Sequence, residues 1–567
     1  MARTSQLSDL FRQSRDTLIA HRDDYERALA AFSWPRLQQF NWALDWFDVI
    51  ARNNANPALR IVGDGGRDVS LSFEELRQRS NRLANRLRSL GLRRGDRILL
   101  MLGNVPNLWE LMLAAIKLSC PVIPTTTLMM AADLRDRVAR GGAKAIVTEA
   151  TYADRFSWLD PSHLKLLAAG HASGWQSLED SGSADADFVA DGPTNASESL
   201  LLYFTSGTTA KPKLVQHTHV SYPVGHLSTM YWLGLRPGDV HLSLSSPGWA
   251  KHAWSSFFAP WNAEATIVAM QTARFDAAQL LRELVRCEVT SFCAPPTVWR
   301  ALIQLPLKDA QVKLRELLSA GEPLNPEVIA RVREAWGLTI RDGYGQTETT
   351  LQIGNFPGQP VKAGSMGLAA PGYRIALLDD DGHEREEGEI CVALADRPVA
   401  VMPGYLDDLE RTTNVMRHGH YHTGDVAMRD ADGYYTYVGR NDDVFKCSDY
   451  RISPFELESL LIEHECVMEA AVVPSPDRQR LSVPKAFVVL RQGFTPTRET
   501  ALSILRFVRA HSSPFKRVRR LEFADLPKTV SGKIRRVELR GVELQRSLEM
   551  RRPQEFWEDD FVELKRE

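Results

Sequence analysis

An α/β fold with more than one domain is what the sequence predicts, and three observations lead to it. The chain has 567 residues, which is too many for a single compact core. Short apolar runs alternate with segments of helical periodicity over most of its length, as in sheets covered by helices. From about residue 370 the segments become shorter and are separated by turns such as 379–382 and 432–433, which indicates a smaller β-rich subdomain.

The first elements are expected to be helical. Residues 5 to about 50 have an amphipathic pattern, and three tryptophans are the expected packing anchors: Trp34, Trp42 and Trp46. Ser72 is the expected N-cap of the next helix, with Glu75 completing a capping box and Gly91 ending the helix. The apolar face of this helix is formed by leucines at helical spacing: Leu76, Leu83, Leu87 and Leu90.

The alternation then continues along the chain. Strands are expected at 97–102, 143–148, 200–204 and 289–294, and helices near 107–118 and 276–286. This order favours a largely parallel sheet. Residues 170–198 are rich in Ser, Ala, Asp and Gly and are expected to form a connector.

Composition argues against several classes of protein. A formal net charge of −2 gives no overall attraction to nucleic acid or to acidic membranes. The six cysteines are scattered without a C-x-x-C pair, so we expect reduced thiols and neither a disulfide framework nor a zinc site. The N-terminus lacks the apolar core of a secretory signal, and no run of 18 apolar residues is present. We therefore expect a cytoplasmic protein with no transmembrane segment.

The most informative stretch is residues 203–213, which follows the expected strand at 200–204. Its hydroxyls, backbone N–H groups and lysines could hold a polyphosphate. It is not a Walker loop, because the chain contains no G-x-x-x-x-G-K-[ST]. The alternative is a polar surface loop between two strands. The candidate phosphate-binding residues are Thr205, Ser206, Gly207, Thr208, Thr209, Lys211 and Lys213.

Two further stretches, 319–325 and 341–348, each follow an apolar segment and are dense in Gly, Pro and polar residues. Such loops suit the carboxyl ends of parallel strands, where open α/β sheets bind ligands. Tyr344 could stack on a planar base, and Glu348 could hold a Mg²⁺ ion that carries phosphates. The alternative is a pair of tight turns.

The last informative stretches lie in the final third of the chain. Asp425, in the motif Y-H-T-G-D, could accept hydrogen bonds from both ribose hydroxyls, and Arg440 could hold a phosphate or ribose oxygen. Lys533 is presented by a glycine-containing loop. The alternative for Asp425 and Arg440 is a surface ion pair, and the alternative for Lys533 is a solvated side chain. Alternating histidines could mimic a metal site, but no carboxylate or thiol spacing completes a ligand set for His418, His420 and His422.

In this order and at this spacing, these stretches resemble the adenylate-forming superfamily of acyl-CoA synthetases, peptide-synthetase adenylation domains and luciferases. The resemblance runs from about residue 50 to 545. Residues 248–249, 344–348 and 450–456 are most similar to the medium-chain acyl-CoA synthetase branch. The resemblance implies an N-terminal region (1–440) of two α/β subdomains plus a β-rich subdomain, followed by a small hinged α+β C-terminal domain (441–567).

The resemblance also implies a role for each stretch. The loop at 205–213 would cover the β- and γ-phosphates, and Asp425 and Arg440 would bind the ribose. Glu348 would lie near Mg²⁺, and Lys533 would be the catalytic lysine of the first half-reaction. The adenine and α-phosphate pocket would be formed by Glu322, Asp342, Gly343, Tyr344, Gly345, Gln346 and Thr347.

Coenzyme A would lie against the segment after the hinge residue, Asp442. Its implied contacts are Ser448, Asp449, Tyr450, Arg451, Lys516 and Arg517. The acyl pocket is expected to contain Trp249, His252 and Gly343. Short-chain acetate enzymes of this superfamily carry a tryptophan where this chain has Gly343, so we expect a pocket that admits a longer or aromatic acid. Two positions depart from the commonest pattern, since Ala210 and Asp449 stand where glycine is usual.

The implied function is an ATP-dependent acyl-CoA synthetase, which forms acyl-AMP and pyrophosphate and then acyl-CoA and AMP. The expected acid is a medium-chain fatty or aromatic carboxylic acid, and the expected cofactor is Mg²⁺. One alternative is an acyl-AMP ligase that loads a carrier protein. That carrier would be a separate protein, because this chain contains no L-G-G-x-S carrier motif. Another alternative is a non-catalytic nucleotide-binding regulator, against which the retention of Lys533, Glu348 and Asp425 argues. Formation of a homo-oligomer is left open.

Overall fold

The computed structural model describes most of the chain. The described residues are 2–63, 68–205, 212–272, 274–321, 324, 326–395, 398–447, 450–477, 481–529, 533–545 and 551–565. The chain divides into two compact units. The first comprises residues 1–375, 392–421 and 431–435, and the second comprises 376–391, 422–430 and 436–567. The expected domain boundary at 440/441 stays a prediction.

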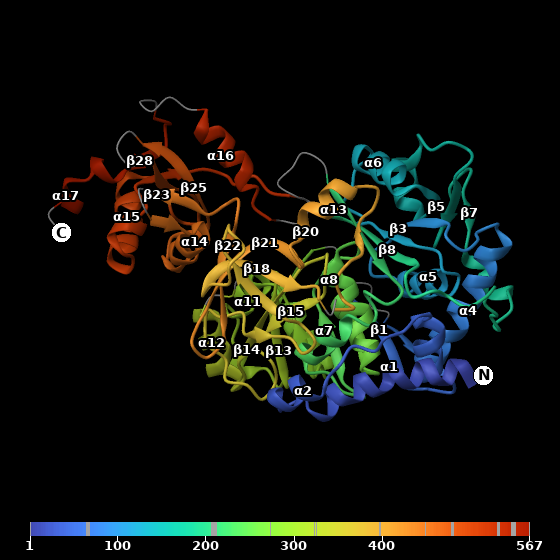
Figure 1. The fold of residues 1–567 in the computed structure, drawn as a ribbon. Helices are drawn as coiled ribbons and strands as arrows, with labels where there is room; N and C mark the ends of the chain where they lie inside the picture. The colour runs from blue at the N-terminus through green and yellow to red at the C-terminus, as the bar shows by residue number, and fades with distance from the viewer. Residues whose placement is uncertain are drawn as a thin grey trace. The chain divides into compact units, whose positions relative to one another are not determined.

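The N-terminal segment of the first unit is helical, as expected, but interrupted. Its elements are α1 (Ala2–Ala20), α2 (Tyr25–Ala31), the π-helix η1 (Trp42–Phe47) and α3 (Asp48–Ala51). α1 packs against α7 (His226–Leu233) (Figure 1). The three predicted tryptophan anchors are buried. Trp42 donates its indole N–H to the side-chain oxygen of Asn262 at 2.8 Å, so these anchors tie the segment to the body of the unit.

An eight-stranded sheet carries the phosphate-loop stretch, in the order β19-β9-β8-β4-β3-β5-β6-β7. Pairing is parallel from β8 through β7 and antiparallel between β8, β9 and β19. The strands are β3 (Arg97–Met101), β4 (Val122–Pro124), β5 (Ala143–Thr148), β6 (Leu164–Leu167), β7 (Gln176–Ser177), β8 (Ser199–Thr205), β9 (Lys213–Thr218) and β19 (Gly404–Tyr405). The helices that belong to it in sequence are α4 (Phe73–Ser89), α5 (Pro106–Lys117) and α6 (Ala131–Gly141).

The start of α4 confirms the predicted capping box. Ser72 Oγ accepts the backbone N–H of Glu75 at 3.2 Å, and a Glu75 carboxylate oxygen accepts the backbone N–H of Ser72 at 2.8 Å. The helix ends before Gly91, which has a φ of +94° that suits glycine. Local chemistry therefore sets both ends of this helix.

A nine-stranded sheet carries the adenine-loop stretches, in the order β16-β15-β14-β13-β12-β10-β11-β1-β2. The six strands from β14 to β1 are parallel to their neighbours, and the edge pairs are antiparallel. The strands are β1 (Pro57–Gly63), β2 (Val69–Ser72), β10 (Val240–Ser243), β11 (Thr266–Gln271), β12 (Ser291–Cys293), β13 (Glu316–Ala320), β14 (Ile340–Gly345), β15 (Leu351–Gly354) and β16 (Leu368–Ala369). The helices near it in sequence are α8 (Ala250–Ala253), η4 (Trp254–Phe258), α9 (Ala259–Asn262), α10 (Ala277–Arg286), α11 (Pro296–Leu302) and α12 (Pro326–Trp336).

One apolar core holds α10, α11 and α12 against this sheet. It contains Leu280, Leu284, Trp299, Leu302, Val328 and Val332 from the helices and Leu242, Val268, Phe292 and Leu317 from the strands. The predicted loop stretches begin inside strands, because residues 319–320 end β13 and residues 341–345 belong to β14. β13 and β14 are parallel neighbours, so their carboxyl ends, at Ala320 and Gly345, lie at the same edge of the sheet.

A third, five-stranded sheet has the order β17-β18-β21-β20, with β22 beside β21. Its strands are β17 (Ile375–Leu378), β18 (Glu387–Ala393), β20 (Met416–Arg417), β21 (His420–Arg429) and β22 (Tyr435–Arg440), and α13 (Leu409–Val415) precedes β20. The predicted change to shorter, β-rich segments after about residue 370 is confirmed by this sheet.

The C-terminal part of the second unit is an α+β structure with its own core. A hairpin of β23 (Phe445–Cys447) and β24 (Tyr450–Ile452) precedes a four-stranded sheet in the order β25-β26-β27-β28. The remaining elements are α14 (Pro454–Glu463), β25 (Val467–Asp477), β26 (Leu481–Leu490), α15 (Arg498–His511), β27 (Arg520–Phe523), α16 (Arg536–Leu544), β28 (Glu555–Trp557) and α17 (Val562–Lys565). Leu461, Val472, Ile504 and Leu521 lie in the apolar core that joins the helices to the sheet.

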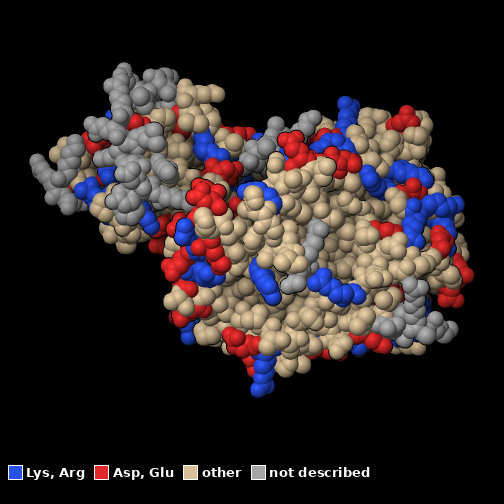
Figure 2. Space-filling view, in the orientation of Figure 1, with Lys and Arg blue, Asp and Glu red and all other residues tan. Residues whose placement is uncertain are grey.

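Surface charge is mixed. On the face shown in Figure 2, the Lys and Arg side chains of the described residues are interspersed with Asp and Glu side chains. Within the described part of the chain, no helix combines the length and the apolar character needed to cross a membrane.

Candidate active site

The predicted phosphate loop begins and ends on two paired strands. Thr205, the last residue of β8, lies opposite Lys213, the first residue of β9. Residues 206–211, which include Ser206, Gly207, Thr208, Thr209 and Lys211, lie outside the described residues. The Lys213 ammonium donates to the Tyr405 hydroxyl at 3.4 Å and lies 5.2 Å from the centre of that ring. Tyr405 therefore contacts one end of the loop.

Tyr405 also connects this loop to Glu348. Its hydroxyl donates to Glu348 Oε1 at 3.0 Å, and the Glu348 residue is only 9% exposed. Among the described residues, one neutral side-chain hydroxyl donates to this nearly buried carboxylate, which has further acceptor capacity for a hard cation, so the donor type fits Mg²⁺. Sequence reasoning missed Tyr405, which carries no motif signal and lies 57 residues from Glu348.

The segment that ends β14 is braced from several directions. The Trp232 indole N–H donates to the Asp342 carbonyl at 3.1 Å, and the Tyr421 hydroxyl donates to Gln346 Oε1 at 2.7 Å. His217 Nε2 lies 2.7 Å from the Thr347 carbonyl. Burial lowers the pKa of His217 to about 3, so the ring is neutral and donates Nε2–H to that carbonyl. These contacts fix the backbone where the predicted adenine pocket lies.

Asp342, in the same segment, has a carboxyl group whose pKa is raised. Loss of hydration raises the pKa of its carboxyl to about 7, while the Gly343 N–H and the Lys251 ammonium oppose the rise. A raised pKa means that the folded protein keeps this proton after the unfolded chain has lost it near pH 4. The contribution of Asp342 to stability is therefore full below about pH 4 and is lost as the pH rises toward 7.

Asp342→Asn is expected to remove this pH dependence, because the amide has nearly the same shape and cannot ionise. The free energy of unfolding of the variant relative to the wild type should rise by about 1–3 kcal/mol between pH 5 and pH 8. Denaturant unfolding of both proteins at the two pH values measures it. An equal difference at pH 5 and pH 8 would show that the carboxyl titrates normally.

The predicted acyl-pocket residues are Trp249, His252 and Gly343. A Cβ placed on Gly343 would lie 2.6 Å from the indole of Trp232, which is almost wholly buried. The absence of a side chain at Gly343 therefore makes space for the Trp232 ring. The side of β14 that faces Trp232 has no room left for a long acyl group. His252 is buried beside Trp109, with ring centres 5.6 Å apart, and burial lowers its pKa to about 3, so its ring is neutral.

Asp425 and Arg440 lie together in the second unit. Asp425 is 5% exposed, and its Oδ1 lies 3.3 Å from Arg440 Nη1 and accepts the Tyr437 hydroxyl at 3.1 Å. Gly424 has a φ of +74°, which favours glycine, and a Cβ there would lie 2.9 Å from Arg440 Nη2 and displace the end of that side chain. The predicted ribose carboxylate is thus held by a cation and a phenol, and the motif glycine is needed for that packing.

The predicted hinge and catalytic lysine also lie in the second unit. Asp442 Oδ1 lies 3.6 Å from Arg440 Nε, and its carbonyl accepts a hydrogen bond from Arg540 of α16. The Lys533 side chain is exposed, and the Lys533 carbonyl accepts the Thr529 N–H at 2.8 Å. Among the described residues no carboxylate pairs with the Lys533 ammonium, so with respect to them it can reach a ligand without first breaking an ion pair.

The predicted coenzyme A residues are only partly described. Ser448 and Asp449 lie outside the described residues, and Tyr450 and Arg451 begin β24. Lys516 pairs with Glu456 at 2.7 Å. The Nε of Arg517 is buried without a hydrogen-bond acceptor among the described residues, which makes it the better phosphate donor of the two. Glu322 also lies outside the described residues.

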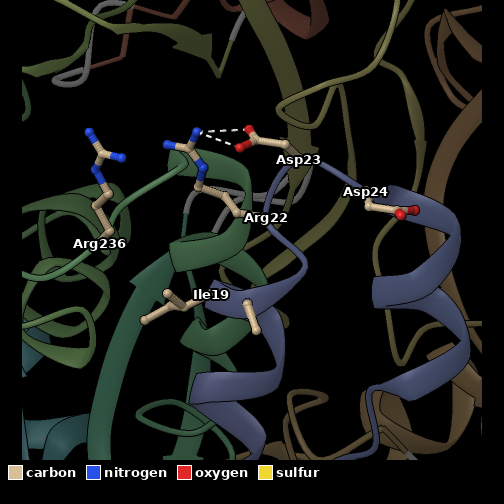
Figure 3. A pocket seen from close by; sticks show the side chains of 6 residues that line it. Ile19, Arg22, Asp23, Asp24 and Arg236 are labelled. Carbon is tan, nitrogen blue, oxygen red and sulfur yellow. Dashed lines mark hydrogen bonds and ion pairs between the residues drawn. The ribbon is translucent and has the colours of Figure 1, made fainter.

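Two pockets of the first unit involve other residues. One of about 280 Å³ is lined by residues at the end of α1, the turn after it and Arg236, and Figure 3 shows Arg22 bound to Asp23 there. A second, of about 510 Å³, lies near Arg341 and Phe356. None of the predicted site residues that the structure describes lines either pocket.

Comparison with solved structures defines the class of enzyme. The anthranilate CoA ligase AuaEII, solved in complex with anthranoyl-AMP, has a TM-score of 0.82 at 27% sequence identity, covering 90% of this chain and 98% of that chain. An acyl-CoA synthetase from Brucella canis has a TM-score of 0.69 at 32% identity, covering 94% and 99%. The fold is therefore that of the adenylate-forming enzymes, as the motifs predicted.

Sequence comparison then gives the family. Residues 47–406 match the AMP-binding enzyme family, and residues 456–533 match the AMP-binding enzyme C-terminal domain. 4-Hydroxybutyrate–CoA ligase 1 of Metallosphaera sedula is 43% identical over 539 residues, covering 93% of this chain and 94% of the relative. Mitochondrial acyl-coenzyme A synthetase ACSM3 of Rattus norvegicus is 38% identical over 555 residues, covering 94% and 96%. The chain belongs to the AMP-binding enzyme family and is an AMP-forming acid–thiol ligase, an acyl-CoA synthetase.

Proposed function

We propose that this acyl-CoA synthetase activates a medium-chain fatty or aromatic carboxylic acid, with Mg²⁺ as its cofactor and Lys533 as the catalytic residue. The observation that carries the choice of acid is the likeness to ligases that act on aromatic acids. At position 343, where acetate enzymes carry a tryptophan, this chain has Gly343. The buried ring of Trp232 fills the space beside that glycine, so the acyl group has to extend on another side of the strand. Aromatic acids are the substrates named for the anthranilate CoA ligase and for a benzoate CoA ligase of the same fold at 28% identity.

In the first half-reaction the acid carboxylate attacks the α-phosphorus of ATP, and pyrophosphate leaves. Two anions must approach each other, so positive charge has to be placed where negative charge develops. The exposed Lys533 ammonium supplies it at the α-phosphate, and Lys213 neutralises the departing phosphates. Asp425 holds the ribose hydroxyls through its carboxylate. Mg²⁺, when bound near Glu348, would neutralise phosphate charge.

In the second half-reaction a thiol attacks the acyl carbonyl and AMP leaves. The acyl group is already activated, so the enzyme has only to position the thiol and exclude water. The buried Nε of Arg517 supports an assignment to the phosphates of coenzyme A. Asp442, at the junction between Arg440 and α16, is the proposed hinge for the change between the two half-reactions.

A panel of carboxylic acids, followed by pyrophosphate release, tests the choice of acid. Octanoate and benzoate are each expected to give a higher kcat/KM than acetate, because the short acid fills less of the pocket. Reactions without acid give the background rate. The proposal is wrong if acetate has the highest kcat/KM of the three.

The thiol that accepts the acyl group can be identified with the same acid. The enzyme is incubated with ATP and either coenzyme A or a phosphopantetheinylated carrier protein, and we expect thioester formation to be faster with coenzyme A. Faster loading of the carrier would instead support the alternative function, an acyl-AMP ligase for a separate carrier protein.

A further inference from the structure

Three potential metal ligands meet between β18 and β21. Glu389 and Cys391 are two residues apart on β18 and so share one face of the sheet. His422 comes from the neighbouring strand β21. Its Nδ1 lies 2.8 Å from Glu389 Oε2 and 3.3 Å from Cys391 Sγ, and the three donor atoms all lie within 4.8 Å of one another.

The positions of these three side chains are fixed by the sheet. The second Glu389 oxygen, Oε1, accepts the backbone N–H of Gly424 at 2.7 Å, which leaves Oε2 directed at His422. The Thr423 hydroxyl donates to the Ile390 carbonyl at 2.7 Å and so links the two strands between the ligands. Groups held on paired strands keep their geometry better than groups on loops.

The set is also shielded from solvent. Cys391 is fully buried, and the His422 side chain is 8% and the Glu389 side chain 15% exposed. Burying polar groups away from water costs free energy. The burial of a thiol, an imidazole and a carboxylate together is therefore unfavourable unless they interact strongly with one another or with a cation.

The donor types select the cation. Sulfur, nitrogen and carboxylate oxygen together suit Zn²⁺, whereas Mg²⁺ prefers oxygen alone. Around tetrahedral Zn²⁺, with bonds of about 2.0–2.3 Å, neighbouring donor atoms are roughly 3.4–3.6 Å apart. The 2.8 Å between His422 Nδ1 and Glu389 Oε2 would widen by about 0.6 Å on binding, the 3.3 Å between Nδ1 and Cys391 Sγ is close to that range, and the third pair of donor atoms lies within 4.8 Å.

We propose that Glu389, Cys391 and His422 form a binding site for a thiophilic divalent cation, Zn²⁺ in the first instance. The Cys391 thiol loses its proton to solvent when the cation binds, the His422 Nδ1 lone pair and Glu389 Oε2 complete three protein bonds, and a water takes the fourth position. The three ligands do not include Glu348, the predicted Mg²⁺ ligand.

The sequence pointed away from such a site. His422 alternates with His418 and His420, but the His420 ring nitrogen Nδ1 bonds the His418 carbonyl at 2.9 Å and takes no part in the cluster. The thiol and carboxylate that sequence spacing did not supply come from a strand 31 and 33 residues earlier.

Cobalt substitution of the full chain tests the proposal. After treatment with a chelator, the wild type is titrated with Co²⁺ and the thiolate-to-cobalt absorption band is followed. We expect one Co²⁺ per chain with such a band, and its loss when Zn²⁺ is added in excess. Cys447→Ser, which alters another buried cysteine of the same unit, is the matched control and should keep the band.

Cys391→Ser should abolish the band, and His422→Asn should weaken cobalt binding strongly. If Cys391→Ser does not fold, Glu389→Gln takes its place, because the amide oxygen can still accept the Gly424 N–H while binding a cation poorly. No band in the wild type, a band that survives in Cys391→Ser, or binding unchanged in both His422→Asn and Glu389→Gln would overturn the proposal.

Discussion

Replacing Lys533 by alanine is expected to lower carboxylate-dependent pyrophosphate exchange by about 10²–10³-fold, the usual effect of removing one group that stabilises transition-state charge. The exposed ammonium is the part of the side chain that can reach a phosphate, and the backbone hydrogen bond between Lys533 and Thr529 does not depend on it. The substitution should therefore remove charge and leave that hydrogen bond in place. ATP–pyrophosphate exchange in the presence of the acid measures the effect.

Two controls separate catalysis from structure. Lys528→Ala alters a lysine of the same loop whose ammonium pairs with Glu469 at 2.6 Å, and it should change the exchange rate by less than about threefold, because an exposed ion pair contributes at most about 1 kcal/mol. Synthetic acyl-AMP and coenzyme A bypass the first half-reaction, so Lys533→Ala should convert them at the wild-type rate. Unchanged exchange in Lys533→Ala would remove this lysine from the mechanism.

Glu543→Ala is expected to lower the free energy of unfolding of the second unit by about 3–5 kcal/mol, the usual cost of removing one partner from a buried ion pair. Glu543 of α16 is fully buried and accepts the Lys485 ammonium at 2.8 Å and the Ser475 hydroxyl at 2.7 Å. Lys485 is fully buried as well and also pairs with Glu522 at 2.6 Å and with Glu555 at 3.3 Å. Without Glu543, Lys485 keeps those two carboxylates, but Lys485 and the Ser475 hydroxyl each lose a hydrogen-bond acceptor and a cavity is left in the core.

Glu538→Ala on the same helix is the matched control. Its carboxylate is exposed and pairs only on the surface with Arg535, so the change should stay within about 0.5 kcal/mol. Denaturant unfolding followed by a probe in the second unit compares the two variants. Equal stability of Glu543→Ala and Glu538→Ala would show that the buried network does not stabilise the fold.

Elements set by neighbouring residues could be predicted from the sequence. The capping box of Ser72 and Glu75 is a local pattern, and the structure contains it as expected. The helix expected near 276–286 is α10, and the strand expected at 289–294 is the shorter β12, because the proline pair that follows directs the chain into α11. The helical stretch predicted over 5–50 is interrupted at 21–24 and at 32–41, and the second interruption contains Pro35, which has no backbone N–H for a helix interior.

The motifs were sufficient to identify the fold and the enzyme class, because both depend on residues that recur together along the chain. The contacts between individual side chains could not be predicted from the motifs. The space beside Gly343 is decided by Trp232, which comes from a helix more than a hundred residues earlier and appears in no motif.

By itself, the sequence determined the order of helices and strands, the adenylate-forming motifs and the set of residues available for chemistry. Only the tertiary structure decided which of them meet: Tyr405 with Glu348 and Lys213, His217 with Thr347, and His422 with Glu389 and Cys391. The physical reason is that sheet order and helix packing bring together residues 31 to 192 positions apart, and no periodicity along the chain records such a pairing.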